Sequence, residues 1–237
     1  MDNELGEKMA VIELRNVVKD YGHFRLSLSM EIERGITAVL GSSGAGKTTL
    51  LRIIALLESF EGEYYFMGEE ASEKHRKKIT MVFQQPVVFR GTVLDNLLYA
   101  LSLDGNSSRE KAEEILEKLN LLEVAKKKAK NLSGGEKQRL AIARALAIER
   151  EVYLFDEPTS NLDAENASIV EKCIRDLAKS GKTIVIATHN IFQAKRLSDK
   201  VAFLHNGKLI EYGETKQIFE NPKNELTKKF VSGDAYY

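Results

Sequence analysis

Residues 41–49, GSSGAGKTT, form a glycine-rich segment whose spacing is typical of a phosphate-binding loop. The pattern G-x-x-x-x-G-K-[ST] begins at Gly41 and directly follows the apolar run Ile36–Leu40, so we expect a strand, a loop and a helix in that order. Glycine lets the backbone turn several N–H groups inward, and the start of the helix adds the positive end of its dipole. A chain of phosphate groups fits such a cavity. The alternative is a glycine-rich turn that only caps a helix.

Three side chains at the end of this loop have separate expected roles. Lys47 would neutralise charge on the β- and γ-phosphates, Thr48 would offer its hydroxyl to Mg²⁺, and Thr49 would bond the α-phosphate. We expect the whole loop to bind the phosphates, which assigns this role to Gly41, Ser42, Ser43, Gly44, Ala45, Gly46, Lys47, Thr48 and Thr49.

A pair of carboxylates follows a second apolar run, in the segment VYLFDEP at residues 152–158. The run predicts a short buried parallel strand that ends in Asp156 and Glu157. Asp156 would hold Mg²⁺ through its water shell, and Glu157 would polarise an attacking water. The alternative, an Asp-Glu pair that merely caps a helix, is weakened by the phosphate loop earlier in the chain.

A second predicted anion site lies in LSGGEKQR, residues 132–139, which we call the signature segment. Ser133 offers a hydroxyl, and Gly134 and Gly135 offer backbone N–H groups at the start of a helix predicted over Glu136–Ile148. Ser133 with Glu136 three residues later also fits a capping box, which would explain the pattern locally. The two interpretations use the same atoms and are compatible.

Together, GSSGAGKTT, Gln84, LSGGEKQR, FDEP, SNLD and His189 resemble the nucleotide-binding subunit of ABC transporters over nearly the whole chain. The signature segment is typical of that family, whereas the phosphate loop is shared with other nucleotide-binding proteins. The resemblance implies ATP and Mg²⁺ as cofactors. It also implies a head-to-tail dimer of two copies, with each ATP held between the phosphate loop of one copy and Ser133, Gly134 and Gly135 of the other.

Further site residues come from this resemblance alone. Gln84 matches the glutamine that reaches Mg²⁺ and the attacking water, although the adjacent Gln85 leaves the choice open. His189 resembles the histidine that contacts the γ-phosphate, with a surface histidine at a strand end as the alternative. Asp163 closes the SNLD segment, which the family uses at the nucleotide interface. Tyr21 resembles the aromatic residue on which adenine stacks, and a tyrosine packed on a sheet is the alternative.

The resemblance implies an α/β fold, a P-loop NTPase core with a mostly parallel sheet, an N-terminal antiparallel β subdomain and an inserted α-helical subdomain. We expect a single domain over residues 1–237. Within it, residues 9–70 would form the antiparallel portion with the phosphate loop and its helix (41–57). Residues 88–140 would form the helical subdomain with the signature segment, and residues 150–237 would complete the core.

Alternating and helical hydrophobic patterns predict the remaining elements. The Asn206-Gly207 pair predicts a hairpin turn between two late strands. The charged run Lys126–Lys130 favours a solvated helix face. Ile79–Phe83 is an apolar run that ends at Gln84. The expected strands are Val11–Val17, Arg25–Glu33, Gly62–Met67, Thr183–Ala187, Lys200–Leu204 and Lys208–Tyr212. The expected helices are Val93–Leu101, Arg109–Leu119, Ile191–Leu197 and a terminal helix, Thr215–Asn221, that stops before Pro222.

The composition limits the class of protein. The 35 Lys and Arg residues balance 35 Asp and Glu residues, so no basic footprint for nucleic acid is expected. The single cysteine, Cys173, excludes a disulfide within the chain and shares a predicted helical face with apolar residues. No apolar run approaches the length of a membrane span, and the start MDNELGEKMA does not resemble a signal peptide. We therefore expect a cytoplasmic protein.

The expected function is ATP hydrolysis that energises a membrane transporter from the inner face of the cell membrane. The segment QPVVFRGTV, residues 85–93, is more apolar than a solvated loop needs, and in the family this region receives a helix of the transmembrane permease. Ordinary packing is the alternative for this segment. The tail NPKNELTKKFVSG resembles the tails of importer subunits for phosphate- or tungstate-like anions, and this resemblance implies an extracytoplasmic solute-binding protein as an indirect partner. A soluble ATPase of the iron–sulfur assembly type and an exporter subunit remain alternatives.

Overall fold

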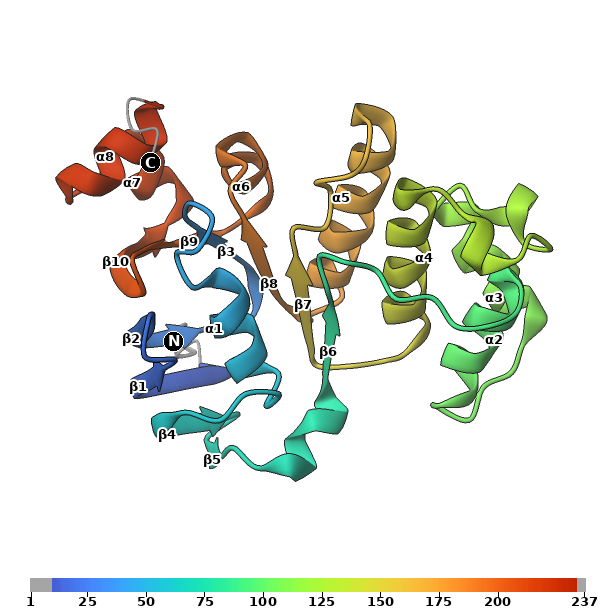
Figure 1. Ribbon diagram of the computed structural model, residues 1–237, viewed down its shortest axis with the longest axis horizontal. Helices are drawn as coiled ribbons and strands as arrows, with labels where there is room; N and C mark the ends of the chain where they lie inside the picture. The colour runs from blue at the N-terminus through green and yellow to red at the C-terminus, as the bar shows by residue number, and fades with distance from the viewer. Residues whose placement is uncertain (1–9, 234–237) are drawn as a thin grey trace, which may run out of the picture.

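The computed structural model describes residues 10–233. The expectation about the start MDNELGEKMA concerns residues that, apart from Ala10, lie outside this range. Within it the strands form one curled sheet in the order β5-β4-β1-β2-β10-β9-β3-β8-β7-β6 (Figure 1). The strands are β1 (Ile12–Asp20), β2 (Arg25–Ile32), β3 (Gly35–Leu40), β4 (Glu61–Phe66), β5 (Glu69–Glu70), β6 (Ile79–Val82), β7 (Val152–Asp156), β8 (Thr183–Thr188), β9 (Lys200–His205) and β10 (Lys208–Glu214).

Five neighbouring strands, β9-β3-β8-β7-β6, run parallel and form the half of the sheet that carries the phosphate loop. The central three, β3, β8 and β7, are short and almost wholly buried, as expected for parallel strands covered on both faces. The helices are α1 (Lys47–Ile54), α2 (Val93–Ser102), α3 (Arg109–Lys118), α4 (Gly134–Ala147), α5 (Ala164–Lys179), α6 (Ile191–Leu197), α7 (Thr215–Glu220) and α8 (Glu225–Ser232).

Alternate residues of the parallel strands face different helices because successive side chains of a strand point to opposite faces. On β7, Leu154 packs in a cluster with Leu50 and Leu51 of α1. Its neighbour Phe155 packs in a second cluster with residues of α4 and α5, such as Ile142. The parallel half of the sheet therefore lies between α1 on one face and α4 and α5 on the other. The loop between β3 and α1 thus joins two elements that are both packed in the core.

The N-terminal strands are antiparallel, as predicted. β1 pairs with both β2 and β4, and β2 is joined to β10 by a single parallel pairing of Ser27 with Lys208. The hairpin between β9 and β10 turns at Asn206 and Gly207, whose φ angles of 46° and 73° suit the mirror-image turns that hairpins prefer. A Cβ atom on Gly207 would lie 1.9 Å from the carbonyl oxygen of Arg25. Only glycine fits this junction.

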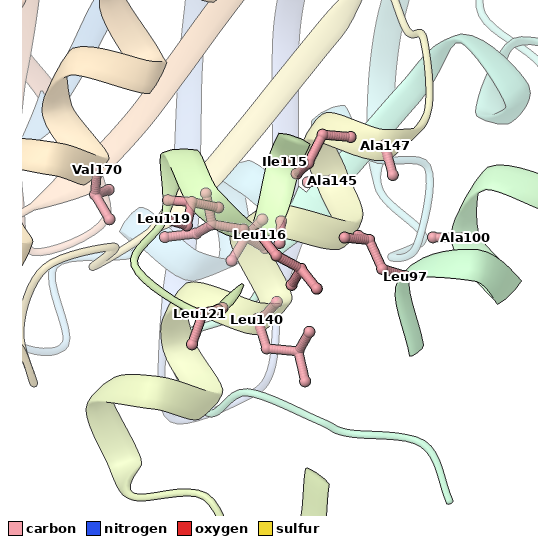
Figure 2. Packing of buried hydrophobic residues seen from close by; sticks show 14 of the residues in the cluster. Leu97, Ala100, Ile115, Leu116, Leu119, Leu121, Leu140, Ala145, Ala147 and Val170 are labelled. Atoms are coloured by element: carbon pink, nitrogen blue, oxygen red, sulfur yellow. The ribbon is translucent and has the colours of Figure 1, made fainter. Parts of the chain in front are cut away.

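The helices between β6 and β7 share a continuous apolar core with the sheet. Figure 2 shows part of this cluster, with Leu97 from α2, Leu116 from α3 and Leu140 from α4. Because α4 contacts both α2 and β6, this helix attaches the helical region to the parallel strands. The start of α4, which carries the signature segment, is held by this packing.

Two expectations about helices are wrong. The chain forms α7 as predicted but then a further helix, α8, so α7 is not terminal. Asn224 begins a new helix after Pro222 by accepting the N–H of Leu226, and Phe230 of α8 lies against Phe203 with ring centroids 4.7 Å apart.

The run Lys126–Lys130 does not form the expected helix face. It is exposed at four of its five positions but lies in a turn and a short 3₁₀ segment, where Lys128 forms an isolated β-bridge with Thr92.

Candidate functional site

The ends of three parallel strands meet at one edge of the sheet. The last residue of β3, Leu40, pairs with Thr188 at the end of β8, and Asp156 at the end of β7 pairs with Ala187. The phosphate loop, Glu157 and His189 each follow one of these strands. The crevice beyond the carboxyl ends of parallel strands is the usual ligand position in such sheets.

Lys47 lies inside the phosphate loop. Its ammonium group donates hydrogen bonds to the carbonyl oxygens of Gly41 at 2.8 Å and Ser42 at 3.0 Å, and the residue is only 8% exposed. Burial lowers the pKa of this ammonium, opposed by the carboxylates of Glu157 and Asp156. Gly46, with φ of 103°, forms the cap of α1 in a conformation that favours glycine. The order of strand, loop and helix is as predicted, and the buried cation Lys47 is the first residue of α1.

Thr48 and Asp156 come together beside this loop. The Thr48 hydroxyl donates to Oδ2 of Asp156 at 2.8 Å. Burial raises the pKa of Asp156, and the hydrogen bond from Thr48 opposes that effect. A hydroxyl and a carboxylate in a buried position supply the oxygen ligands that Mg²⁺ prefers, so the residues present fit this ion.

Glu157 contacts two other predicted site residues. Its Oε1 lies 2.8 Å from Nδ1 of His189, accepts the backbone N–H of His189 at 3.1 Å, and lies 3.9 Å from Nζ of Lys47. Glu157 is buried, with φ of 49°, a left-handed conformation that costs energy for a residue other than glycine. Its backbone N–H is satisfied by the carbonyl of Ala187. The fold thus holds a carboxylate in a strained position next to a cation and an imidazole.

A cavity of about 690 Å³ extends from the phosphate loop to Tyr21, which is 40% exposed. This volume falls within the roughly 300–1,000 Å³ of small-molecule sites. His23, Phe24 and Arg52 also line it. Their only signal in the sequence was their nearness to Tyr21 and to the helix after the phosphate loop. The residues of the phosphate loop that line the cavity are Gly44, Gly46, Lys47, Thr48 and Thr49, while Ser42 and Ser43 line a second cavity that includes His189.

The signature segment forms the predicted capping box. The Ser133 hydroxyl accepts the N–H of Glu136 at 3.2 Å, and the Glu136 carboxylate accepts the N–H of Ser133 at 2.7 Å. Gly135 lies against Asn161, because a Cβ atom there would be 3.2 Å from the Asn161 carbonyl oxygen. In Figure 1, α4 stands on the far side of β7 and α5 from α1. One chain therefore does not bring the signature segment to its own phosphate loop.

Two other predicted site residues, Asp163 and Gln84, lie in segments outside the contacts described above. Asp163 caps α5 by accepting the N–H of Asn166 at 2.8 Å. Gln84 and Gln85 are both exposed in the segment after β6. Strand β6 ends at Val82, beside Phe155 of β7, and Gln84 lies in the bend that follows. The role of Gln84 stays a prediction.

Comparisons with known proteins agree with this geometry. The ABC transporter family matches residues 26–160. The phosphate import ATP-binding protein PstB of Thermotoga maritima is 41% identical and aligns over 94% of this chain and 98% of its own length. PstB of Campylobacter jejuni is also 41% identical, over 87% of this chain and 91% of its own length. The chain belongs to the ABC transporter family of ATP-binding proteins.

Solved structures of the family support the same conclusion. CbiO1 of Clostridium perfringens, described as part of the cbiONQ ABC transporter complex, is 26% identical with a TM-score of 0.77 and covers 95% of this chain and 99% of its own. The cassette MJ0796, solved as a dimer in a post-hydrolysis state with ADP and Pi, is 30% identical with a TM-score of 0.77. It covers 86% of this chain and 98% of its own.

The family resemblance, the α/β P-loop fold and the expected activity are therefore confirmed. The chain is an ATPase that uses ATP with Mg²⁺. No helix between residues 10 and 233 combines the length and apolarity needed to cross a membrane.

Proposed function

We propose that this chain energises the import of phosphate, as the ATP-hydrolysing subunit of a membrane transporter. The observation that carries the proposal is the 41% identity to a phosphate import ATP-binding protein over nearly the full length of both chains. Neither alternative, an exporter subunit or an ATPase of iron–sulfur assembly, has comparable support.

The site residues supply a consistent mechanism for hydrolysis. Residues 41–49 cradle the phosphates through backbone N–H groups, and Lys47 neutralises their charge. Thr48 and Asp156, with Gln84 as a further ligand, would hold Mg²⁺, and the bound ion would supply electrostatic stabilisation of the transferred phosphoryl group. Glu157 orients water for in-line attack, while His189 contacts the γ-phosphate. Adenine stacks on the exposed ring of Tyr21.

Two copies complete the site by head-to-tail pairing. In one chain Ser133, Gly134 and Gly135 form an anion-binding helix start that faces no phosphate loop of its own. In the pair these residues contact the γ-phosphate held by the partner, and Asp163 lies at the same interface. Closure of the pair around ATP and reopening after hydrolysis would drive the transporter.

An exposed apolar surface is the proposed contact with the permease. Val87 and Tyr99 are 63% and 53% exposed, and Phe89 is 42% exposed. Arg144 of α4 orders the segment by donating to the Val87 carbonyl at 2.6 Å and by lying 4.2 Å from the Phe89 ring centroid. An ordered apolar patch of this kind marks an interaction site. The chain would thus sit on the cytoplasmic face of the membrane and act indirectly with an extracytoplasmic solute-binding protein.

Transport by a reconstituted complex tests the proposal. The tagged chain would be extracted from its own membranes with the permease it retains and placed in vesicles with ATP on the side of this subunit. The extracytoplasmic solute-binding protein from the same organism would be added on the opposite side, and uptake of radiolabelled phosphate would be measured. We expect ATP-dependent uptake of phosphate that tungstate and molybdate inhibit only weakly. The Glu157→Gln variant should take up no phosphate. Active ATP hydrolysis without phosphate uptake would contradict phosphate as the cargo.

A further inference from the structure

A buried polar cluster lies outside the nucleotide cavity and joins α5, α6 and the turn after β7. Its centre is Gln193 of α6, which is 1% exposed. The Gln193 amide nitrogen donates to the Thr159 hydroxyl at 2.7 Å and to Oε1 of Glu171 at 3.2 Å. Glu171 of α5 is 3% exposed and is held by Arg196, whose guanidinium donates to both of its oxygens.

The orientation of the Gln193 amide is determined by its partners. An ionised carboxylate only accepts hydrogen bonds, so Glu171 requires the nitrogen of the amide on its side. Arg196 fixes Glu171 through two parallel hydrogen bonds, which gives the carboxylate one geometry. The amide nitrogen is therefore directed at Thr159 as well.

The two ends of this cluster attach to segments that carry site residues. Helix α6 begins two residues after His189, and its cap Asn190 accepts the backbone N–H of Gln193 at 2.9 Å. Thr159 lies two residues after Glu157, in a turn where its carbonyl accepts the N–H of Leu162. A shift at Gln193 would move the segment of His189 relative to the segment of Glu157.

We infer that Gln193 is a positioning residue for ATP hydrolysis, holding Glu157 and His189 in their mutual geometry through Thr159 and Glu171. The inference rests on the proposed roles of Glu157 and His189. Neither Gln193 nor Glu171 lines the nucleotide cavity, so their effect falls on the chemical step and not on binding of ATP. Misplacement of reacting groups by about 1 Å costs on the order of 10²-fold in rate.

Gln193→Glu tests the inference because it keeps the shape of the side chain and removes the amide N–H groups that donate to Thr159 and Glu171. The new carboxylate would face Glu171, with Arg196 as the nearby cation, and repulsion between the two carboxylates would favour protonation of one of them. We expect kcat to fall about ten- to hundredfold at pH 8, with the KM for ATP within about twofold. The difference in kcat between the variant and the unaltered protein should shrink as the pH falls toward 5.5, because a protonated carboxyl group can donate a hydrogen bond again.

Gln217→Glu is the matched control. The Gln217 amide also donates to a carboxylate, Glu211 at 2.8 Å, but this pair joins α7 to β10 and involves neither the turn after Glu157 nor the segment of His189. This control should leave kcat and its pH profile unchanged. Gln193→Met, which has no polar atoms to pair, should lower kcat at every pH.

The outcomes separate this inference from the proposed mechanism. Wild-type kcat in both Gln193 variants, or a loss of ATP binding that parallels the loss of turnover, overturns the positioning role. Full turnover by Glu157→Gln would instead overturn the proposed chemistry itself. Binding of a fluorescent ATP analogue by each variant, at unchanged affinity, establishes that its fold is intact.

Discussion

Oε1 of Glu157 lies 2.8 Å from Nδ1 of His189 and accepts the backbone N–H of the same histidine. A carboxylate cannot donate a hydrogen, so the ring contact requires the hydrogen on Nδ1. Nε2 of a neutral His189 is then an acceptor and cannot donate to a phosphate. Contact of His189 with the γ-phosphate therefore requires either a protonated ring or release of Nδ1 from Glu157. Binding of ATP should therefore either add a proton to the ring or separate this pair.

Glu157→Gln should stop hydrolysis without disturbing the fold. The glutamine oxygen can still accept the backbone N–H of His189, while the general base is lost. We expect the release of phosphate to fall about 10²- to 10⁴-fold. A sizing column with ATP should show a stable dimer of the variant. If it stays monomeric with saturating ATP, the head-to-tail sandwich is wrong.

Ser133→Arg should separate nucleotide binding from turnover. Ser133 lies far from the phosphate loop of its own chain, so the affinity of the monomer for ATP should be unchanged. The arginine would obstruct the γ-phosphate held by the partner, and turnover should stop. The matched control is Ser108→Arg, which removes the same kind of helix cap from α3, where Ser108 accepts the N–H of Lys111. Equal turnover by the two variants would contradict the role of the signature segment.

Tyr21→Ala should weaken ATP binding and leave the chemistry intact. Stacking of a base on an aromatic ring contributes about 1–3 kcal/mol, so the Kd should rise roughly 5- to 150-fold. Tyr21→Trp should restore the affinity because it restores the flat ring. Equilibrium titration with ATP gives the affinity, and kcat at saturating ATP is the internal control. An unchanged Kd in Tyr21→Ala would favour the alternative of a tyrosine that only packs on the sheet.

The phosphate loop, its flanking strands and the start of α4 were predictable because short-range patterns determine them. The glycine spacing, the apolar runs and the Ser133–Glu136 capping box each occupy a few consecutive residues, and the structure has all three. Helix α8 was missed because Pro222 indicated a stop. Asn224 as a cap and the apolar pair Leu226 and Phe230 were the signal for it.

Contacts between distant segments were not predictable in the same way. Gln193 and Glu171 are 22 residues apart, on two helices whose relative placement depends on the packing of the whole sheet. Their residue types are common on helix surfaces, so only the fold reveals that they are buried together. The same limit applies to Gly135 and Asn161, which link the signature segment to the turn after β7.

The capping box of α4 should make the free energy of unfolding depend on pH below the ordinary glutamate pKa of 4.5. Hydrogen bonding to the backbone N–H of Ser133 lowers the pKa of Glu136 below its ordinary value of 4.5. The ionised carboxylate therefore stabilises the folded state fully above the unfolded-state pKa, and this contribution is lost as the pH falls through the lower folded-state pKa. In Glu136→Gln the amide oxygen still accepts the N–H of Ser133 but does not titrate. Urea midpoints of the two proteins should differ at pH 7, in favour of Glu136, and converge below pH 4. A difference that persists unchanged at pH 3 would mean that the carboxylate charge contributes nothing to this helix start.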